Sequence, residues 1–213
     1  MQQAPRNEPE PRKVFQFVGG ALCLDFCNSV GGKRGERPRE WLNHYGDLLS
    51  WSEQALLIER SSLDTFQRNA TRNPAAAAEV LGRAVVLRES VYRIFMAIRD
   101  GKKPAEKDLE TLNRELGRSL SRLRVVPGKN GFGWAWEPAR GVLDYPLGPI
   151  ARSAGELLTS AALLLNLRQC QGENCGWLFL DSSKNHSRSW CDMRDCGNRA
   201  KVRRHRMRHK MKP

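Results

Sequence analysis

Four cysteines near the end of the chain have the spacing of metal ligands. Cys170 and Cys175 enclose four residues, Cys191 and Cys196 enclose another four, and fifteen residues separate the two pairs. Four thiolates suit the tetrahedral coordination that Zn²⁺ prefers, and four protein ligands leave no open position for a substrate. The spacing therefore predicts one structural Zn²⁺ bound by these four side chains.

Two disulfides, or four unrelated buried thiols, are the alternatives to a metal site. The first ten residues, MQQAPRNEPE, lack the apolar stretch of a signal peptide, and no apolar run in the 213 residues is long enough to span a membrane. We therefore expect a cytoplasmic protein with no membrane partner. Thiols stay reduced in the cytoplasm, which favours thiolate–metal bonds over disulfides.

The residues around the cysteines predict the elements that position them. Trp177 and Phe179 alternate with two leucines, which is the pattern of a strand, and the polar residues 182–187 follow as a turn. We expect residues 188–190 to return as the second strand of a hairpin. Residues 198–205, after the last cysteine, have a helical pattern. A knuckle, a hairpin, a second knuckle and a helix together describe a treble-clef-like finger.

Three motifs frame the cysteines: Gly-Trp-Leu-Phe-Leu-Asp at 176–181, Arg-Ser-Trp-Cys-Asp-Met at 188–193, and Cys-Gly-Asn-Arg at 196–199. With the cysteine spacing, they closely resemble the CGNR zinc-finger family. Proteins of that family carry an N-terminal domain called ABATE and are described as candidate stress-induced transcription regulators. A looser match to ABATE rests on Leu24-Asp25-Phe26-x-Asn28, with Cys27 where many members have an aliphatic residue. The resemblance implies a zinc-binding regulator.

The residues before the finger are predicted to form a helical domain. Forty per cent hydrophobic residues and six tryptophans supply its core. The clearest element begins at Asn73-Pro74, an N-cap followed by proline at the first helical position, and ends at Gly101. Its apolar residues recur every three or four positions. Further helices are expected at 45–57, 63–69, 104–116 and 150–165, with a short strand at 14–20 and a β-hairpin at 121–136. Residues 21–30 fit either a helix or a strand, and we favour the helix.

The predicted fold class is mainly α with small β-hairpins (α+β). Residues 1–13 are rich in Pro, Glu and Arg and are expected to be disordered. The ABATE-like helical domain is expected at 14–166, and the zinc finger with a basic C-terminal helix at 167–213. No long linker separates these two domains, so we expect the finger to pack against the helices.

The positive charge of the chain is concentrated at its end. The formal net charge is +13, and residues 199–212 hold eight Lys or Arg and no acid. Such a cluster favours a polyanionic partner, with DNA before RNA. A flexible solubilising tail, or contact with an anionic membrane or protein surface, are the alternatives. The candidate nucleic-acid-binding residues are Arg199, Lys201, Arg203, Arg204, Arg206, Arg208 and Lys210.

Asn198 and Arg199 follow the last ligand at the expected start of the helix. Arginine pairs with guanine and asparagine with adenine in the major groove, so both residues could read bases. In the structural alternative, Asn198 satisfies backbone groups of the knuckle and Arg199 pairs with Asp181. Gly197 is explained by a close approach of the backbone to the zinc site.

Asp25 and Asn28, beside Cys23 and Cys27, are candidates for a ligand pocket in the helical domain. A domain that senses a small-molecule effector needs such a pocket. In the alternative, which the usual behaviour of these residues favours, the two polar side chains cap local backbone and the cysteines are small core residues. A second metal at the cysteines lacks further ligands, because the four histidines lie at 44, 186, 205 and 209.

These observations predict a DNA-binding transcription regulator whose N-terminal domain senses a signal or forms a homodimer. A zinc-stabilised RNA-binding protein is the alternative. Treble-clef modules also occur in nucleases, and Asp181, His186, His205 and His209 could form such a site, but no acid accompanies the two helix histidines. No phosphate-binding loop or Gly-x-Ser-x-Gly motif is present. We therefore expect a protein that is not an enzyme.

Overall fold

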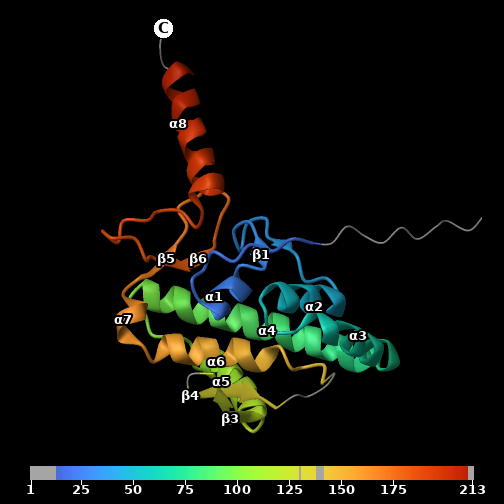
Figure 1. Ribbon diagram of the computed structural model, residues 1–213. Helices are drawn as coiled ribbons and strands as arrows, with labels where there is room; N and C mark the ends of the chain where they lie inside the picture. Colours follow the sequence, from blue (N-terminus) through green and yellow to red (C-terminus); the bar gives the residue numbers. More distant parts are fainter. Residues whose placement is uncertain (1–12, 130, 138–141, 211–213) are drawn as a thin grey trace, which may run out of the picture.

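The computed structural model describes residues 13–129, 131–137 and 142–210. Packed helices form the body, the finger lies on one side of it, and one helix projects from the finger away from the body (Figure 1). The disorder expected for residues 1–13 concerns positions outside the described residues, except for Lys13. Lys13 is held in place, because its Nζ donates hydrogen bonds to Asp47 Oδ2 at 2.7 Å and to the Trp41 carbonyl at 3.1 Å.

Helices dominate the described residues, as the sequence predicts. They are α1 (Leu22–Cys27), α2 (Tyr45–Gln54), the 3₁₀ turn η1 (Arg60–Ser62), α3 (Leu63–Arg72), α4 (Pro74–Arg99), α5 (Glu106–Leu120), α6 (Leu147–Leu158), α7 (Ala161–Leu164), the π-helical turn η2 (Met193–Gly197) and α8 (Asn198–Lys210). The strands form antiparallel pairs: β1 (Val30–Gly31) with β2 (Arg39–Glu40), β3 (Leu123–Gly128) with β4 (Gly131–Trp136), and β5 (Leu167–Gln169) with β6 (Leu178–Leu180).

Helix α4 is the axis of the body, and α1, α2, α3, α5 and α6 all contact it (Figure 1). Its start is capped as predicted: Asn73 Oδ1 accepts a hydrogen bond from the Ala76 N–H at 3.1 Å, and Pro74 follows. The predicted apolar face is buried, with Leu87, Ile94 and Phe95 fully shielded from solvent. The long apolar stripe of this helix therefore organises the core.

Two elements of the helical domain differ from the prediction. Residues 14–20 form no strand, because the backbone N–H of Phe15 bonds to the side chain of Gln54 on α2 at 3.0 Å rather than to a neighbouring strand. The single helix expected at 150–165 is divided into α6 and α7. After α6, the Thr159 hydroxyl donates to the Gly155 carbonyl at 3.0 Å, a local bond of the kind that competes with helix continuation.

The hairpin of the finger also differs from the prediction. Strand β6 does not pair with residues 188–190 but with β5, in the register Leu167 opposite Leu180 and Gln169 opposite Leu178. The β5–β6 hairpin therefore encloses the first cysteine pair instead of lying between the two pairs. The predicted alternation is nevertheless present, since Phe179 packs with the cysteines while Leu178 belongs to the core of the helical domain.

The finger is bound tightly to the helical domain through main-chain groups of residues 176–180. The side chain of Asn28, the residue that follows α1, makes two hydrogen bonds of 2.9 Å to the backbone of Leu178, one as donor and one as acceptor. The Trp177 Nε1–H donates to the Val30 carbonyl at 2.7 Å. Leu167 and Leu178 are also buried in the core of the helical domain, so the finger contributes side chains to that core as well as to its own cluster around the cysteines.

We expect Asn28→Ala to lower the free energy of unfolding by about 2–4 kcal/mol, because it leaves two buried backbone groups of Leu178 without partners. Chemical denaturation of the zinc-loaded chain measures the change. Asn113→Ala, at an exposed position of α5, is the matched control and should change stability by less than about 0.5 kcal/mol. Equal stability of the two variants would contradict a role for Asn28 in joining the finger to the helices.

Candidate metal centre and basic helix

The four cysteines meet in one buried cluster at the base of α8. Their sulfur atoms all lie within 4.8 Å of one another, with Cys191 Sγ 3.8 Å from Cys175 Sγ and 3.7 Å from Cys196 Sγ. A tetrahedron of sulfur atoms with metal bonds of about 2.3 Å has edges of about 3.8 Å. The sulfur positions thus fit a single tetrahedral Zn²⁺. Four protein ligands close the coordination sphere, so the centre is structural.

Local backbone geometry explains how the two cysteine pairs are shaped. At Gly172, a β-carbon would lie 3.1 Å from Cys175 Cβ and 3.2 Å from Cys196 Sγ, so a larger residue there would press on two of the ligands. In the second pair, Asp192 Oδ1 accepts the Arg194 N–H at 2.7 Å and begins the π-helical turn η2. Gly197 was expected to lie close to the metal, but a β-carbon there would instead meet Met193 Sδ at 2.9 Å.

A backbone donor supports thiolate character at the first ligand. The Gly172 N–H points to Cys170 Sγ at 3.4 Å. Metal ligands must be deprotonated, and a donor directed at a ligand sulfur stabilises its negative charge.

Aromatic residues form the wall of the metal centre. Trp177 and Phe179 are buried with the four cysteines, and Val18, Trp41 and Trp190 pack against this cluster. The rings of Trp41 and Trp177 meet edge to face, with centroids 5.9 Å apart at 84°. Trp41 comes from the helical domain, so that domain supplies part of the apolar shell that shields the metal from water.

Arg188 and Asp181 fix the loop between β6 and the second cysteine pair, a role that no local sequence pattern indicates. Asp181 is buried and accepts hydrogen bonds from the Ser183 N–H and hydroxyl at 2.9 and 2.6 Å and from the Arg188 N–H at 2.9 Å. The Arg188 guanidinium lies 4.4 Å from the ring centroid of Phe179 and donates to the carbonyls of Trp190 and Cys191. These contacts hold the second pair against the first.

Arg199 is bound to the metal centre and not to Asp181, the partner named in the structural alternative. Its Nη2 donates to Asp195 Oδ2 at 2.7 Å and to Cys196 Sγ at 3.5 Å. Partial burial lowers the pKa of Arg199, but the bond to Cys196 and the charge of Asp195 outweigh it, and the pKa is raised. The guanidinium thus offsets negative charge on a ligand sulfur. A base-reading role for Arg199 stays a prediction.

Asn198 has the contact that the structural alternative requires. Its Nδ2 donates to the Arg194 carbonyl at 3.0 Å, which satisfies a backbone acceptor of the turn before α8. This bond supports a knuckle-stabilising role for Asn198, which is exposed at the start of the helix.

Asp25 and Asn28 both bind backbone, which favours the capping role over the ligand pocket. Asp25 Oδ1 accepts the Gly19 N–H at 2.7 Å, and Asn28 is occupied by Leu178 as described above. Cys23 and Cys27 are completely buried in the core, and burial raises the pKa of Cys23 to about 12. The only group in the described part of the chain that could hold a metal is the cluster of four cysteines, so neither these two cysteines nor Asp181, His186 and His205 form a second centre. The side chain of His209 lies outside the described residues.

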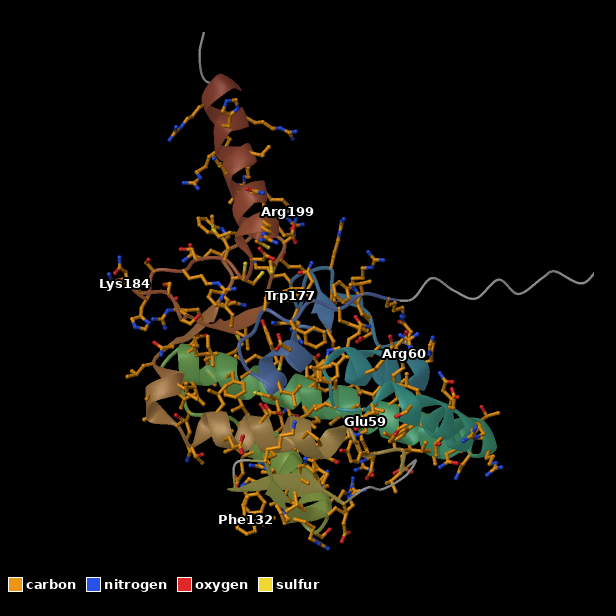
Figure 2. All side chains as sticks on the ribbon, viewed as in Figure 1. Glu59, Arg60, Phe132, Trp177, Lys184 and Arg199 are labelled. Carbon is orange, nitrogen blue, oxygen red and sulfur yellow. The ribbon has the colours of Figure 1, made fainter. Side chains whose placement is uncertain are left out.

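Helix α8 extends the metal centre into solvent with an unbroken basic surface. Residues 198–210 include seven Lys or Arg and no acid, and every residue from Lys201 to Arg208 is exposed (Figure 2). Even Val202 and Met207 are about half exposed, at 49 and 52 %. The described contacts of the helix with the finger lie near its base, where Arg203 meets Glu173 and the Arg204 guanidinium lies 5.9 Å from the ring of Trp190. The side chain of Lys210 lies outside the described residues.

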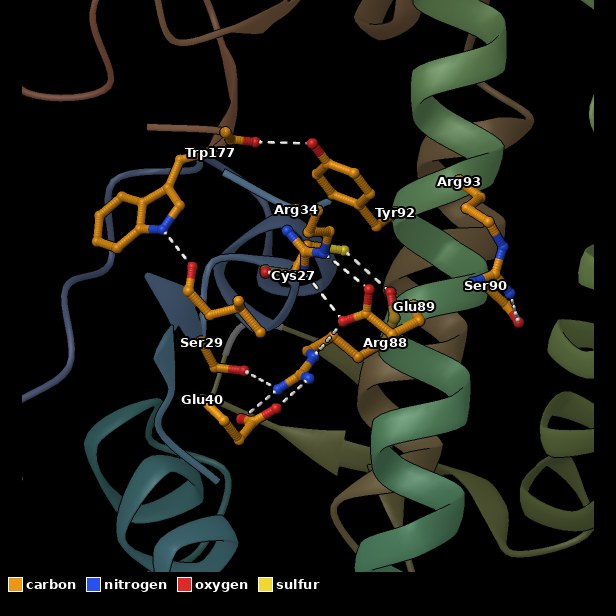
Figure 3. Close-up of polar contacts among 12 residues, drawn as sticks. Cys27, Ser29, Arg34, Glu40, Arg88, Glu89, Ser90, Tyr92, Arg93 and Trp177 are labelled. Carbon is orange, nitrogen blue, oxygen red and sulfur yellow. Dashed lines mark hydrogen bonds and ion pairs between the residues drawn. The ribbon is translucent and has the colours of Figure 1, made fainter. Parts of the chain in front are cut away.

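A network of ion pairs in the helical domain supports the first knuckle (Figure 3). The Arg88 side chain is 2 % exposed and pairs with Glu40 at 2.6 Å and Glu89 at 2.9 Å. Arg34 bonds to Glu89 at 2.8 Å, and its guanidinium lies 3.7 Å from the ring centroid of Tyr92. The Tyr92 hydroxyl in turn donates to the Gly176 carbonyl at 3.1 Å, one residue after a metal ligand. Sequence patterns gave no sign of this network, because its members are far apart in the chain.

A closed four-cysteine centre seated on a helical domain and continued by a basic helix defines a zinc-finger protein with an N-terminal helical domain. Family models agree: residues 166–209 match the "CGNR zinc finger", and residues 20–161 match ABATE, described as "Putative stress-induced transcription regulator". The chain belongs to the ABATE family, and its finger binds one structural zinc ion through the four cysteines. No curated protein matches the chain.

Across the described residues, none of the helices is long and apolar enough to cross a membrane.

We expect the zinc-loaded protein to contain about one zinc per chain and Cys191→Ser to lose it, because a hydroxyl replaces one of four thiolates. Elemental analysis of the purified variants measures the metal. Cys27→Ala, which removes a buried thiol outside the cluster, is the control and should keep its zinc. Full zinc content in Cys191→Ser would contradict the assignment of the ligands.

A second expectation concerns Asp25, whose pKa is raised from 3.8 to about 6 because burial opposes its charge more than the Gly19 and Val18 N–H groups favour it. A carboxyl with a raised folded-state pKa destabilises the fold once it ionises. Asp25→Asn should therefore match the wild type near pH 4 and become relatively more stable as the pH rises to 7, by up to about 2–3 kcal/mol. Denaturation of both proteins across this pH range measures the difference. A difference independent of pH would show that Asp25 ionises normally.

Proposed function

We propose that this protein is a DNA-binding transcription regulator that acts by placing α8 against duplex DNA, and that it is not an enzyme. The observation that carries the proposal is a projecting helix with seven basic residues, no acid and no buried apolar face. Most helices in proteins are stabilised by packing an apolar face, and α8 lacks one. A phosphate backbone would supply the missing stabilisation, because basic side chains on the helix release counterions when they bind it.

The dimensions of α8 suit the major groove. Thirteen residues correspond to a helix of about 20 Å, and a helix of about 10–12 Å in diameter fits a groove about 12 Å wide. Basic residues lie on two faces: Arg199, Arg203, Arg206 and Lys210 follow one, and Lys201, Arg204 and Arg208 follow the opposite one. A helix charged on both sides can contact the phosphates of both strands that border the groove. The deep, narrow major groove of duplex RNA does not admit a helix in this way.

The zinc centre gives the helix a rigid mount. Helix α8 begins within two residues of the ligand Cys196, and the bonds of Arg199 to Asp195 and Cys196 hold its first turn. A short solvent-exposed helix is only marginally stable in water. Fixing its first turn on a metal centre lowers the entropy that DNA binding would otherwise cost.

The helical domain is proposed as the part that senses a signal. A hollow of about 660 Å³ lies between α2, α3 and the start of α4, bordered by Tyr45, Leu49 and Ala77, and it is large enough for a small effector. A compound that binds there should raise the melting temperature of the wild type but not of Ala78→Trp, which fills the rim of the hollow. Equal responses of both proteins would exclude this hollow.

The DNA-binding proposal predicts the salt dependence of binding to a duplex of about two helical turns, measured by fluorescence anisotropy. Four phosphate contacts give a slope of log K against log salt of about −3.6. Arg203→Ala with Arg206→Ala should flatten the slope by about 1.8 if the first face contacts phosphates, and Arg204→Ala with Arg208→Ala should do so if the second does. The two double variants are matched to each other, because each removes one contact between α8 and the finger: Arg203 with Glu173 in the first, and Arg204 with Trp190 in the second.

Arg68→Ala with Arg72→Ala removes the same charge from exposed positions on α3 and is the control for net charge. It should leave the slope nearly unchanged. If neither pair of changes on α8 alters the slope more than this control does, the basic helix does not bind DNA. Stronger binding to duplex RNA of equal length would favour an RNA-binding protein instead.

A further inference from the structure

The segment Lys33-Arg-Gly-Glu-Arg-Pro-Arg39, which joins β1 to β2 in the helical domain, carries four basic residues and one acid. We propose that this β1–β2 loop is a second contact with the DNA backbone, made mainly by Arg37 and Arg39 beside the base of α8. The inference rests on the DNA-binding function proposed above, and it assigns a nucleic-acid contact to the regulator domain as well as to the finger.

The loop is fixed rather than flexible, because its second residue is anchored in the body. Arg34 bonds to Glu89 through Nε at 2.8 Å and to the Cys27 carbonyl through Nη2 at 2.7 Å, and it stacks on Tyr92 (Figure 3). Its Nη1 is buried and has no hydrogen-bond partner among the described residues, a cost that the stacking on the aromatic ring offsets. Arg34 therefore holds the loop in place, and its hydrogen bonds within the protein leave it unable to contact a ligand.

Gly32 closes the loop and ties it to the zinc finger. Its φ is +77°, and a β-carbon there would lie 2.6 Å from the Arg37 carbonyl, so only glycine fits. The Gly32 carbonyl accepts the N–H of Gly176, the residue after the ligand Cys175, at 3.2 Å. The loop and the first knuckle are therefore one rigid unit.

Lys33 and Arg37 of the loop lie next to the first knuckle of the metal centre from which α8 rises. A hollow of about 500 Å³ is lined by Lys33, Glu36 and Arg37 of the loop and by Asn174 of the knuckle. The neighbouring knuckle residue Glu173 meets Arg203 of α8 and also acts electrostatically on Lys33. The β1–β2 hairpin lies on the side of the body from which α8 projects (Figure 1). A duplex bound to α8 would thus run past the loop.

Ion pairing within the loop identifies Arg37 and Arg39 as the groups free to contact phosphates. Lys33 pairs with Glu36 at 2.9 Å, and Arg34 is engaged in the body. Both Arg37 and Arg39 are exposed, and neither has an ion-pair partner in the described part of the chain. Successive side chains of a strand point to opposite faces, so Arg39 points away from the side on which Glu40 meets Arg88.

Unpaired cations at the base of a helix that is itself strongly cationic raise the free energy of the unbound protein. Interspersed acids would relieve this repulsion, yet the described acids nearby, Glu36 and Glu173, already pair with Lys33 and Arg203. A polyanion that spans both elements removes the repulsion and gains additional contacts. Because the loop is already ordered, these contacts cost little conformational entropy.

The test extends the salt series to Arg37→Gln with Arg39→Gln in the full-length zinc-loaded chain. The expected result is a slope flattened by about 1.8, two contacts at about 0.9 each, with weaker binding of all duplex sequences alike. Arg37→Lys with Arg39→Lys keeps the charge and should restore the wild-type slope. Zinc content and melting temperature of each variant show that the finger and the fold are intact.

The outcomes separate this inference from the function on which it rests. If the changes on α8 flatten the slope while the glutamine variant matches the Arg68→Ala, Arg72→Ala control, the loop does not contact DNA, although the protein binds it. If wild-type protein, α8 variants and loop variants all have the same affinity, the DNA-binding function itself fails, and the loop contact fails with it. If the glutamine variant loses zinc while the lysine variant keeps it, the two arginines support the knuckle instead of contacting DNA, and the proposal is overturned.

Discussion

The backbone from Gly176 to Leu180 belongs to two cores at once, and the rest of the structure depends on this sharing. Its side chains alternate in the way any strand imposes, with Trp177 and Phe179 on the metal side and Leu178 on the side of the helices. A one-residue shift would exchange the two faces and empty both cores. Asn28 prevents such a shift, because its amide can match the donor and acceptor of Leu178 in only one register. The zinc site is therefore held by the helical domain as well as by its own ligands.

The ion pairs around Arg88 illustrate how the helical domain is adapted to carry the finger. Burial raises the pKa of Glu40 and of Glu89, but the hydrogen bonds from Arg88 and Arg34 lower both pKa values below the ordinary range. Buried ion pairs contribute little net stability, since desolvation opposes the attraction, yet they fit only one arrangement of the elements that supply them. Here those elements are α4, β2 and the β1–β2 loop, and the last of these is bonded to the knuckle. The ion-pair network fixes the relative positions of these three elements more than it stabilises the fold.

Much of this architecture could be predicted from local patterns, and the remainder depends on contacts between distant residues. The cap at Asn73, the apolar stripe of α4, the β3–β4 hairpin and the cysteine spacing are local signals, and the structure contains all four features. The partner of β6 was predicted wrongly because the residues that follow it are as polar and turn-rich as a hairpin requires, whereas its true partner β5 precedes the first cysteine. The pair of Arg199 with Asp195 was not predicted, and the alternative named Asp181 as the partner. Asp181 instead accepts hydrogen bonds from the Arg188 and Ser183 N–H groups. Sequence spacing identifies the ligands of a metal, but not the residues that orient them.

The first turn of α8, next to the metal centre, differs from the later residues of the helix in how its charge is matched. At the first turn, Arg199 bonds to Asp195 and to the sulfur of Cys196, so its charge is matched within the protein. Acids disappear from the sequence after Asp195, and the charges of Arg206 and Arg208 meet only solvent among the described residues. A chain that needed the helix only for packing would place apolar residues on one face, and one that needed only solubility would intersperse both signs of charge. Helix α8 instead has a fixed first turn whose charge is matched, followed by cationic residues without partners, which is the arrangement that the proposed DNA contact requires.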